Sequence, residues 1–195
     1  ALVDERVLKL ARPGVDVEYA GKRGGKPSPK QRSISLRLIE YARAGKRVLR
    51  LKGGDPFLFG RGGEEALALV AARVPFRVVP GVTSGVGGLA YAGIPATHRD
   101  VNHAVTFVTG HMAGGDVPDT INWRALAEGS PVIVIYMGLK HLPQITRALM
   151  DGGRAGLEPV AVISNATTDR QRVLETTLGS AVADVAAGQV EAPAL

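Results

Sequence analysis

The sequence contains no cysteine, and this absence excludes disulfide bonds, thiolate nucleophiles and cysteine-ligated metals. Aromatic residues are few, at 5% of the chain, with a single tryptophan. No apolar run approaches the roughly 20 residues that a membrane-spanning helix needs. The histidines show no metal-ligand spacing, and an ordinary polar or core role is expected for each: His98, His103, His111 and His141. The expectation is a cytoplasmic protein with no metal and no membrane partner.

The composition is that of an ordinary globular protein. Apolar residues make up 45% of the 195 residues and charged residues 22%, which is enough apolar material for a hydrophobic core. This length suits one large domain or two small ones.

Positive charge is concentrated in one part of the chain, although the net charge of the whole is only +6. From Lys22 to Lys52 there are eleven lysines and arginines and a single acid, Glu40, whereas the remainder carries more acids than bases. Most charge runs are solvated helix faces. Part of this one adjoins a glycine-rich stretch, which favours an anionic partner.

Short apolar runs alternate with segments of helical periodicity. Strands are predicted at 17–21, 47–51, 76–80, 103–110, 131–137 and 159–165, and helices at 28–45, 63–72, 81–93, 139–151 and 179–187. This alternation is typical of an α/β protein with mainly parallel strand pairing. A change in composition at 97–102 predicts a boundary near residue 100, which gives an N-terminal domain 1–100 and a C-terminal domain 101–195.

Small and polar residues follow each predicted strand, most clearly at 52–63, which read KGGDPFLFGRGG. Ligands of α/β sheets bind at the carboxyl ends of the strands, and glycine lets the backbone approach a ligand closely. The common nucleotide motifs do not explain these glycines. Residues 53–63 lack the dinucleotide spacing, residues 20–28 lack the first glycine and the hydroxyl of a phosphate loop, and Ser84 lies one position late for a hydrolase elbow.

The chain resembles the S-adenosylmethionine-dependent tetrapyrrole methyltransferases, and among them the members that methylate uroporphyrinogen III. The matching stretches follow the family's order over nearly the whole chain: GKRGGKPSPKQ (21–31), RVLRLKGGDPFLFGRGGEE (47–65), VPFRVVPGVTSGVGGLAYAGIPATHRD (74–100), VTFVTGH (105–111), VIYMGL (134–139) and VISNATTDRQRV (162–173). KGGDPFLFGRG is shared widely among precorrin methyltransferases. GKRGGKPSPKQ, with the later THR, is more specific to the uroporphyrinogen members.

This resemblance implies two α/β domains with the cofactor in the cleft between them, and a homodimer. It implies transfer of two methyl groups from S-adenosylmethionine to C2 and C7 of uroporphyrinogen III, giving precorrin-2 for sirohaem and cobalamin synthesis. S-adenosylhomocysteine is then the second product, and no metal takes part. The family's opening strand with its GAGPGDP-type loop, an aspartate before the equivalent of residue 1, and its closing strand are expected to be missing from this chain.

The resemblance also carries over particular residues. Lys22, Arg50 and Arg61 match positions near the substrate, whose eight carboxylates would give the positive segment its purpose, and Lys22 is further expected to assist proton movement. Asp55 is expected to bond the amino group of the methionine moiety or a ribose hydroxyl. The strand-end residues match the cofactor site: Gly53, Gly54, Asp55, Thr83, Ser84, Tyr136, Met137, Asn165, Ala166, Thr167 and Ala194.

Three alternatives stay open. The chain would methylate a later precorrin or another acceptor, or it would be a partial chain with a structural role. The third is a polyanion- or nucleic-acid-binding module that uses the positive segment. Such modules usually expose stacking aromatics, and between Lys22 and Lys52 the only aromatic residue is Tyr41, on the apolar stripe of a predicted helix. No nucleic-acid partner is therefore expected.

Overall fold

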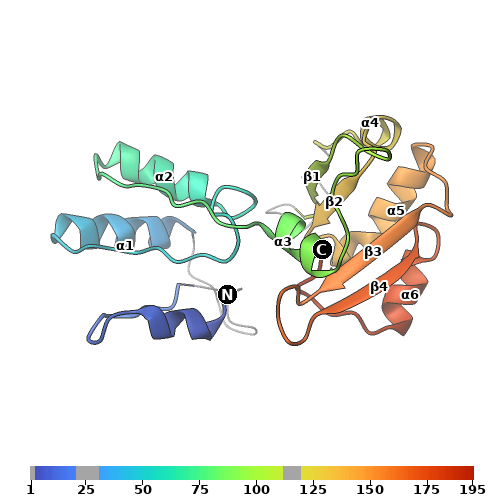
Figure 1. Cartoon of the computed structure of the whole chain (residues 1–195). Helices are drawn as coiled ribbons and strands as arrows, with labels where there is room; N and C mark the ends of the chain where they lie inside the picture. The colour runs from blue at the N-terminus through green and yellow to red at the C-terminus, as the bar shows by residue number, and fades with distance from the viewer. Residues whose placement is uncertain (1–2, 21–30, 112–119) are drawn as a thin grey trace. The chain divides into compact units, whose positions relative to one another are not determined.

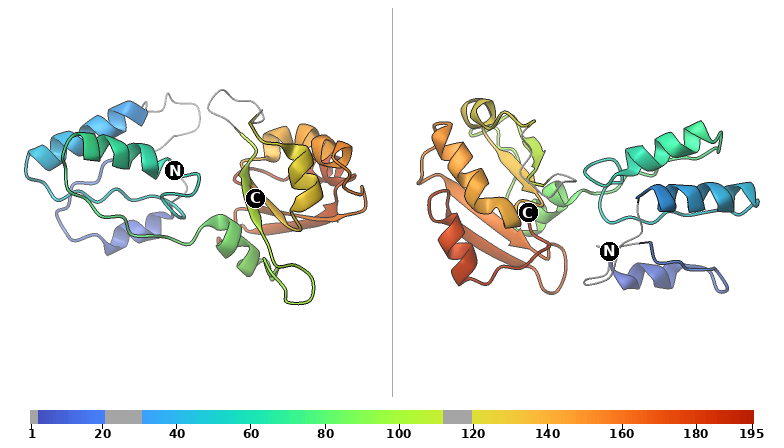
Figure 2. Two further views of the ribbon diagram at one scale, coloured as in Figure 1. Left: turned by 90° about the horizontal axis from the view of Figure 1, so that it is seen from above. Right: turned by 180° about the vertical axis from the view of Figure 1, so that it is seen from behind.

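The structure is a computed structural model that describes residues 3–20, 31–111 and 120–195. The chain divides into two compact units, Ala1–Thr83 and Ser84–Leu195, each of which can be followed in Figures 1 and 2. The division falls before α3 (Ser84–Tyr91) rather than near residue 100. The reason is that α3 contacts strand β2 (Ile133–Tyr136) of the second unit.

The first unit contains the 3-10 helix η1 (Glu5–Leu10) and the helices α1 (Gln31–Arg43) and α2 (Gly62–Ala71). Helices α1 and α2 pack side by side (Figure 1). Ile34 on α1 is buried, in agreement with the predicted apolar stripe. The predictions of helices around α1 and α2 are therefore confirmed.

The strands predicted at 17–21, 47–51 and 76–80 are wrong for the residues that the structure describes there, since none of these forms a β-ladder. Apolar side chains in these segments remain exposed, and Leu49 shows 83% of its surface. An apolar run of β-branched residues indicates only that a segment suits a strand. A strand also needs a second segment in register to pair its N–H and C=O groups, and that condition is not visible in the run itself.

In the second unit, the described residues form further strands and helices besides β2 and α3. Strand β1 (Thr106–Thr109) pairs parallel with β2, with Thr106 opposite Ile133, whereas β3 (Pro159–Ser164) pairs antiparallel with β4 (Arg172–Thr177). The helices are α4 (Trp123–Gly129), η2 (Leu139–His141), α5 (Leu142–Asp151) and α6 (Ala181–Ala187). The predicted strands 103–110, 131–137 and 159–165 and the helices near 139–151 and 179–187 are confirmed, whereas α4, β4 and η1 were not predicted.

The core of the second unit lies under helix α5. Ile145 and Leu149, one helical turn apart, are almost fully buried and form a cluster with Leu178. Successive residues of β2 point to opposite faces of the strand. Ile133 and Ile135 pack against the α5 cluster, while Val134 and Tyr136 are buried on the other face, which α3 contacts. This arrangement places the end of β2 next to the start of α3.

Tyr41, the one aromatic residue of the positive segment, is engaged within the first unit. Its hydroxyl donates to Glu18 Oε2 at 2.7 Å, and Lys46 Nζ lies 5.3 Å from the centre of its ring. Arg37 forms an ion pair with Glu18 at 2.5 Å. These contacts engage the hydroxyl and the ring of Tyr41 within the first unit.

Candidate active site

The glycine-rich loop of the first unit, residues 53–61, joins Lys52 to helix α2. Asp55 organises this loop through its carboxylate: Oδ1 accepts hydrogen bonds from the backbone N–H groups of Phe57 (2.8 Å) and Leu58 (3.2 Å), and Oδ2 accepts one from Gly81 (3.1 Å). Gly54 adopts a φ of 68°, a conformation that favours glycine. The role of Asp55 that the structure displays is therefore to hold the loop against residue 81.

These bonds predict a pH dependence. The N–H group of Gly81, followed by those of Phe57 and Leu58, holds the pKa of Asp55 below its ordinary value of 3.8. A carboxyl group whose pKa is lower in the folded state stabilises the fold above the unfolded pKa, and this stabilisation is lost as the pH falls through the folded pKa. We expect the Tm difference between the wild type and Asp55→Asn to be present at pH 7 and to shrink below about pH 4.

Asp151→Asn is the matched control for this measurement, because Asp151 is exposed at the end of α5 and makes only a 3.7 Å ion pair with Arg147. Its Tm difference from the wild type should stay small throughout. A Tm difference for Asp55→Asn that is the same at pH 3 and pH 7 would contradict the loop-holding role of the carboxylate.

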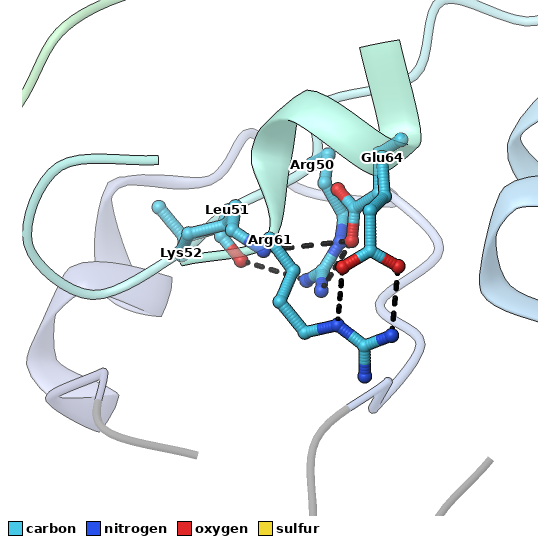
Figure 3. A network of polar contacts seen from close by, with 6 residues as sticks. Arg50, Leu51, Lys52, Arg61 and Glu64 are labelled. Atoms are coloured by element: carbon cyan, nitrogen blue, oxygen red, sulfur yellow. Dashed lines mark hydrogen bonds and ion pairs between the residues drawn. The ribbon is translucent and has the colours of Figure 1, made fainter. Parts of the chain in front are cut away.

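The two arginines predicted near the substrate are both paired with acids of α2, but in different surroundings (Figure 3). Arg61 forms a two-bond contact with Glu64, at 2.8 and 2.7 Å, and both side chains are 55% exposed. Arg50 lies deeper and bonds Glu65 and the carbonyl oxygen of Leu51. Exposed ion pairs contribute only about 0–1 kcal/mol, so Arg61 is available to an incoming carboxylate. Lys22 lies outside the described residues.

In the second unit, the start of α3 meets the end of β2 through Tyr136. The backbone N–H of Gly85 donates to the Tyr136 hydroxyl at 2.7 Å, in a buried contact, and the N–H of Gly110 donates to the Tyr136 carbonyl at 2.7 Å. The Tyr136 ring also lies edge-on to Phe107, with 6.1 Å between ring centres. Tyr136 was predicted to contact the cofactor, and the structure shows its hydroxyl joining α3 to β2.

The loss of this hydroxyl has a predictable effect. Tyr136→Phe leaves the buried N–H of Gly85 without its acceptor, and a buried unsatisfied donor costs about 1–3 kcal/mol. The expected cost lies near the lower end of this range of free energies. For a chain of this size, it corresponds to a Tm lower by roughly 3–6 °C. Thermal unfolding of Tyr136→Phe beside Tyr41→Phe, whose hydroxyl lies near the surface, provides the measurement. Equal Tm values for Tyr136→Phe and the wild type would rule out a stabilising role for the contact.

The segments after β2 and β3 adopt left-handed backbone conformations. Positive φ angles occur at Met137 (55°), Asn165 (46°) and Thr167 (65°), as they also do at Phe59 (52°) and Arg61 (57°) in the glycine-rich loop. Such angles are uncommon for non-glycine residues, and they concentrate where ligands bind. Of the seven described non-glycine residues with a positive φ, these five lie in predicted site loops, whereas Arg73 and Gln189 do not.

Residues 164–167 are held in place by the C-terminal segment and by α3. The N–H of Asn165 donates to the carbonyl of Pro193 at 2.9 Å, and Ser164 forms a β-bridge with Ala194. Gly88 of α3 lies so close to Ala166 that a Cβ added to it would stand 3.1 Å from the Ala166 Cβ. Helix α3 thus contacts Tyr136 through Gly85 and Ala166 through Gly88, while Ala194 pairs with Ser164, next to Asn165.

His111 follows β1 and stacks on His141, with 5.7 Å between ring centres and 27° between ring planes. His141 is buried. Within the described ranges, no group of three or more His, Cys, Asp or Glu side chains is arranged to hold a metal ion. In the same part of the chain, no helix is both long and apolar enough to cross a bilayer.

Three residues that shape these loops were missed by the sequence analysis: Glu65, Gly81 and Gly85. The two acids that begin α2 were explained by the helix dipole, and nothing in the sequence separates the exposed Glu64 from the buried Glu65. Gly81 and Gly85 follow the strand predicted at 76–80. Their position after a predicted strand was the one signal in the sequence that could have identified them as site residues.

The family profile, the related sequences and the related solved structure all point to the tetrapyrrole methylases. The sequence profile of the tetrapyrrole (corrin/porphyrin) methylases matches residues 1–182. The chain is 69% identical over all 195 residues to a Sinorhizobium sp protein named uroporphyrinogen-III C-methyltransferase, of which it covers 70%. It is 47% identical over 196 aligned positions to the siroheme synthase of Azotobacter vinelandii, of which it covers 41%. The solved structure of the Thermus thermophilus uroporphyrin-III C-methyl transferase complexed with S-adenyl homocysteine matches 98% of this chain and 79% of that one, at 42% identity and a TM-score of 0.79.

Proposed function

Because the chain belongs to the tetrapyrrole (corrin/porphyrin) methylase family, we propose that it transfers methyl groups from S-adenosylmethionine to C2 and C7 of uroporphyrinogen III, giving precorrin-2. The observation that carries this proposal is the 69% identity, over the whole chain, to a uroporphyrinogen-III C-methyltransferase. The Thermus thermophilus relative is complexed with S-adenyl homocysteine, the product that methyl transfer leaves. The siroheme synthase relatives favour the sirohaem branch as one destination of the product.

S-adenosylmethionine supplies a methyl group on a positively charged sulfur. A nucleophilic pyrrole carbon forms a bond to this methyl group while the carbon–sulfur bond breaks, and the electron pair of that bond stays on the sulfur. The methylated ring, which is then positively charged, loses a proton. No side chain has to form a covalent intermediate, which agrees with a chain that has no cysteine. The work of the protein is to align the two reactants and to exclude water.

The loops of each unit suit a cofactor with many polar edges. Gly53 and Gly54 are exposed and carry no side chain that would keep a ligand from the backbone. In the second unit, the left-handed conformations at Met137, Asn165 and Thr167 turn backbone groups out of the regular strand pattern. We assign cofactor binding to these backbone groups and to Thr83, Ser84, Ala166 and Ala194. Asp55 and Tyr136 contribute by holding their loops.

The substrate carboxylates require cations, and Arg61 offers the most accessible one in the described loop. Its guanidinium group is already in the two-bond geometry that binds a carboxylate, with Glu64 as the partner. A carboxylate of the tetrapyrrole takes the place of Glu64 with little loss, because the exposed pair is weak. Lys22 and Arg50 remain proposed substrate contacts on the strength of the resemblance.

Mass spectrometry of the tetrapyrrole tests the proposal. The protein is incubated with S-adenosylmethionine and freshly prepared uroporphyrinogen III, and the expected product is heavier by two methyl groups. A reaction without protein and one with S-adenosylhomocysteine in place of the methyl donor are the controls. Methylation of a later precorrin but not of uroporphyrinogen III would transfer the proposal to the related acceptor.

The resemblance also supports a homodimer in the cytoplasm. Size-exclusion chromatography with light scattering should give twice the mass of the chain. The mass of a single chain at micromolar concentration would contradict the homodimer without affecting the proposed reaction.

A further inference from the structure

Glu65, in the first turn of α2, is an acid that is almost completely buried, with 4% of its surface exposed. A buried carboxylate is costly unless it is paired and hydrogen-bonded. Here one oxygen, Oε1, accepts from Arg50 Nε (3.3 Å), Arg50 Nη2 (3.2 Å) and Lys52 Nζ (3.4 Å). Arg50, Lys52 and Glu65 are called the Glu65 cluster below; Figure 3 shows its surroundings.

The two sides of the Glu65 cluster come from the two ends of the glycine-rich loop. Arg50 and Lys52 lie directly before residues 53–61, and Glu65 lies in the helix that begins directly after them. The cluster therefore joins the residues directly before the loop to helix α2, which follows it. A second contact supports the same closure, since the N–H of Gly62 donates to the carbonyl of Pro56 at 2.9 Å.

Burial distinguishes this cluster from the neighbouring Arg61–Glu64 pair. Arg61 and Glu64 are each 55% exposed, whereas the side chain of Lys52 is only 15% exposed. Burial is also the first cause that lowers the pKa of Lys52, and the charge of Glu65 opposes this effect. Water can replace Glu64 at the surface, whereas Lys52 and the partly buried Arg50, whose side chain is 28% exposed, have less access to water as a substitute for Glu65. The Glu65 cluster is thus a fixed element of the fold.

We propose that Glu65 is a positioning residue for the methyl transfer: its carboxylate holds Arg50 and Lys52 and thereby fixes the loop 53–61 in its binding conformation. This inference rests on the proposed function, in which Gly53 and Gly54 of that loop bind the cofactor. Three of the five N–H groups of Arg50 are used within the protein, by Glu65 and by the carbonyl of Leu51. Within the described ranges the other two have no acceptor and can meet a substrate carboxylate, so Glu65 also sets the direction in which Arg50 presents them.

The test compares Glu65→Gln, which keeps the shape and removes the charge, with the wild type. Binding of S-adenosylhomocysteine is measured by calorimetry, and KM is measured separately for S-adenosylmethionine and uroporphyrinogen III. A misplaced binding loop costs up to about 100-fold, so we expect S-adenosylhomocysteine affinity to fall at least about tenfold. KM for the tetrapyrrole should rise by a smaller factor, because Arg50 loses the partner that orients it while Arg61 is untouched. Glu128→Gln, which removes an exposed acid paired with Arg124, is the control.

Two further variants separate positioning from simple loss of stability. Glu65→Asp retains the charge and should restore part of the affinity. The double variant Lys52→Met, Glu65→Gln also removes the lysine that lost its partner. It should bind S-adenosylhomocysteine more tightly than Glu65→Gln alone, because an unpaired charge of Lys52 then no longer disturbs the loop.

Hydrogen exchange of the loop amides gives a readout that does not depend on the reaction. In Glu65→Gln, exchange across residues 53–61 should be at least about tenfold faster than in the wild type, with α5 unchanged; if this variant does not fold, the same comparison is made with Glu65→Asp. Unchanged loop exchange, or unchanged S-adenosylhomocysteine affinity in a folded variant, overturns the inference. Failure of the wild type to bind S-adenosylhomocysteine would instead overturn the proposed function, and the exchange data would still decide whether Glu65 fixes the loop.

Discussion

Replacing Gly81 with alanine is expected to lower the stability of the first unit by about 3 kcal/mol and to weaken S-adenosylhomocysteine binding at least about tenfold. A Cβ at this position would stand 2.3 Å from the carbonyl oxygen of Gly54 and 3.0 Å from its carbonyl carbon. Both are backbone atoms, so no change of rotamer relieves the overlap. The shift that follows would also break the bond from Gly81 N–H to Asp55, which is 3.1 Å long. Residues 54, 55 and 81 would therefore move together.

Thermal unfolding and calorimetry test this expectation, and Gly63→Ala is the matched control. For a chain of this size, about 3 kcal/mol corresponds to a Tm lower by roughly 6–12 °C. A Cβ added to Gly63 meets nothing within 4 Å, and Gly63 lies in helix α2. Gly63→Ala should therefore raise helix stability by about 0.5–1 kcal/mol. If Gly81→Ala melted at the same temperature as the wild type, the close approach of residue 81 to the loop would be disproved.

Replacing Arg61 with alanine is expected to lower kcat/KM for uroporphyrinogen III by about 10- to 100-fold. Hydrogen bonds to charged groups contribute about 1.5–3 kcal/mol, and each 1.36 kcal/mol corresponds to a factor of ten. The Tm should change little, because the Arg61–Glu64 pair is exposed. Affinity for S-adenosylhomocysteine should stay within about threefold of the wild type.

Arg61→Lys and Arg124→Ala complete this experiment. Lysine retains the charge but lacks the planar group that contacts both carboxylate oxygens, so Arg61→Lys should recover only part of the lost kcat/KM. Arg124 forms a similar exposed pair, with Glu128 at 2.9 Å, in the second unit. Arg124→Ala should leave the kinetics unchanged. An equal loss of activity in Arg61→Ala and Arg124→Ala would point to a general effect of net charge instead of a carboxylate contact at residue 61.

Elements that depend on a pattern within one segment of sequence are formed where they were predicted. The helix predicted at 139–151 and the strand predicted at 131–137 each depend on a pattern within one segment, and the structure forms both, as α5 and β2. The resemblance of KGGDPFLFGRG and the other stretches to the tetrapyrrole methyltransferases is likewise a property of the sequence alone, and the family membership confirms it.

The segments 47–51 and 76–80 show the limit of that approach. Their composition is that of strands, yet the structure gives them no ladder, because pairing depends on a second segment and not on the run itself. The contacts of a side chain likewise depend on residues that are distant along the chain. Asp55 and Tyr136 were predicted to be site residues, but one donor to each, Gly81 and Gly85 respectively, lies 26 or 51 positions away along the chain.

By itself, the sequence determined the α/β class, the family and the loops proposed to bind the cofactor, because these depend on residue type and short-range spacing. Only the tertiary structure decided which charges are buried. Glu64 and Glu65 are adjacent identical residues, yet one is exposed beside Arg61 and the other is enclosed with Arg50 and Lys52. The physical reason is that burial and ion pairing depend on what the fold brings together around a side chain, and neighbouring positions on a helix point in different directions.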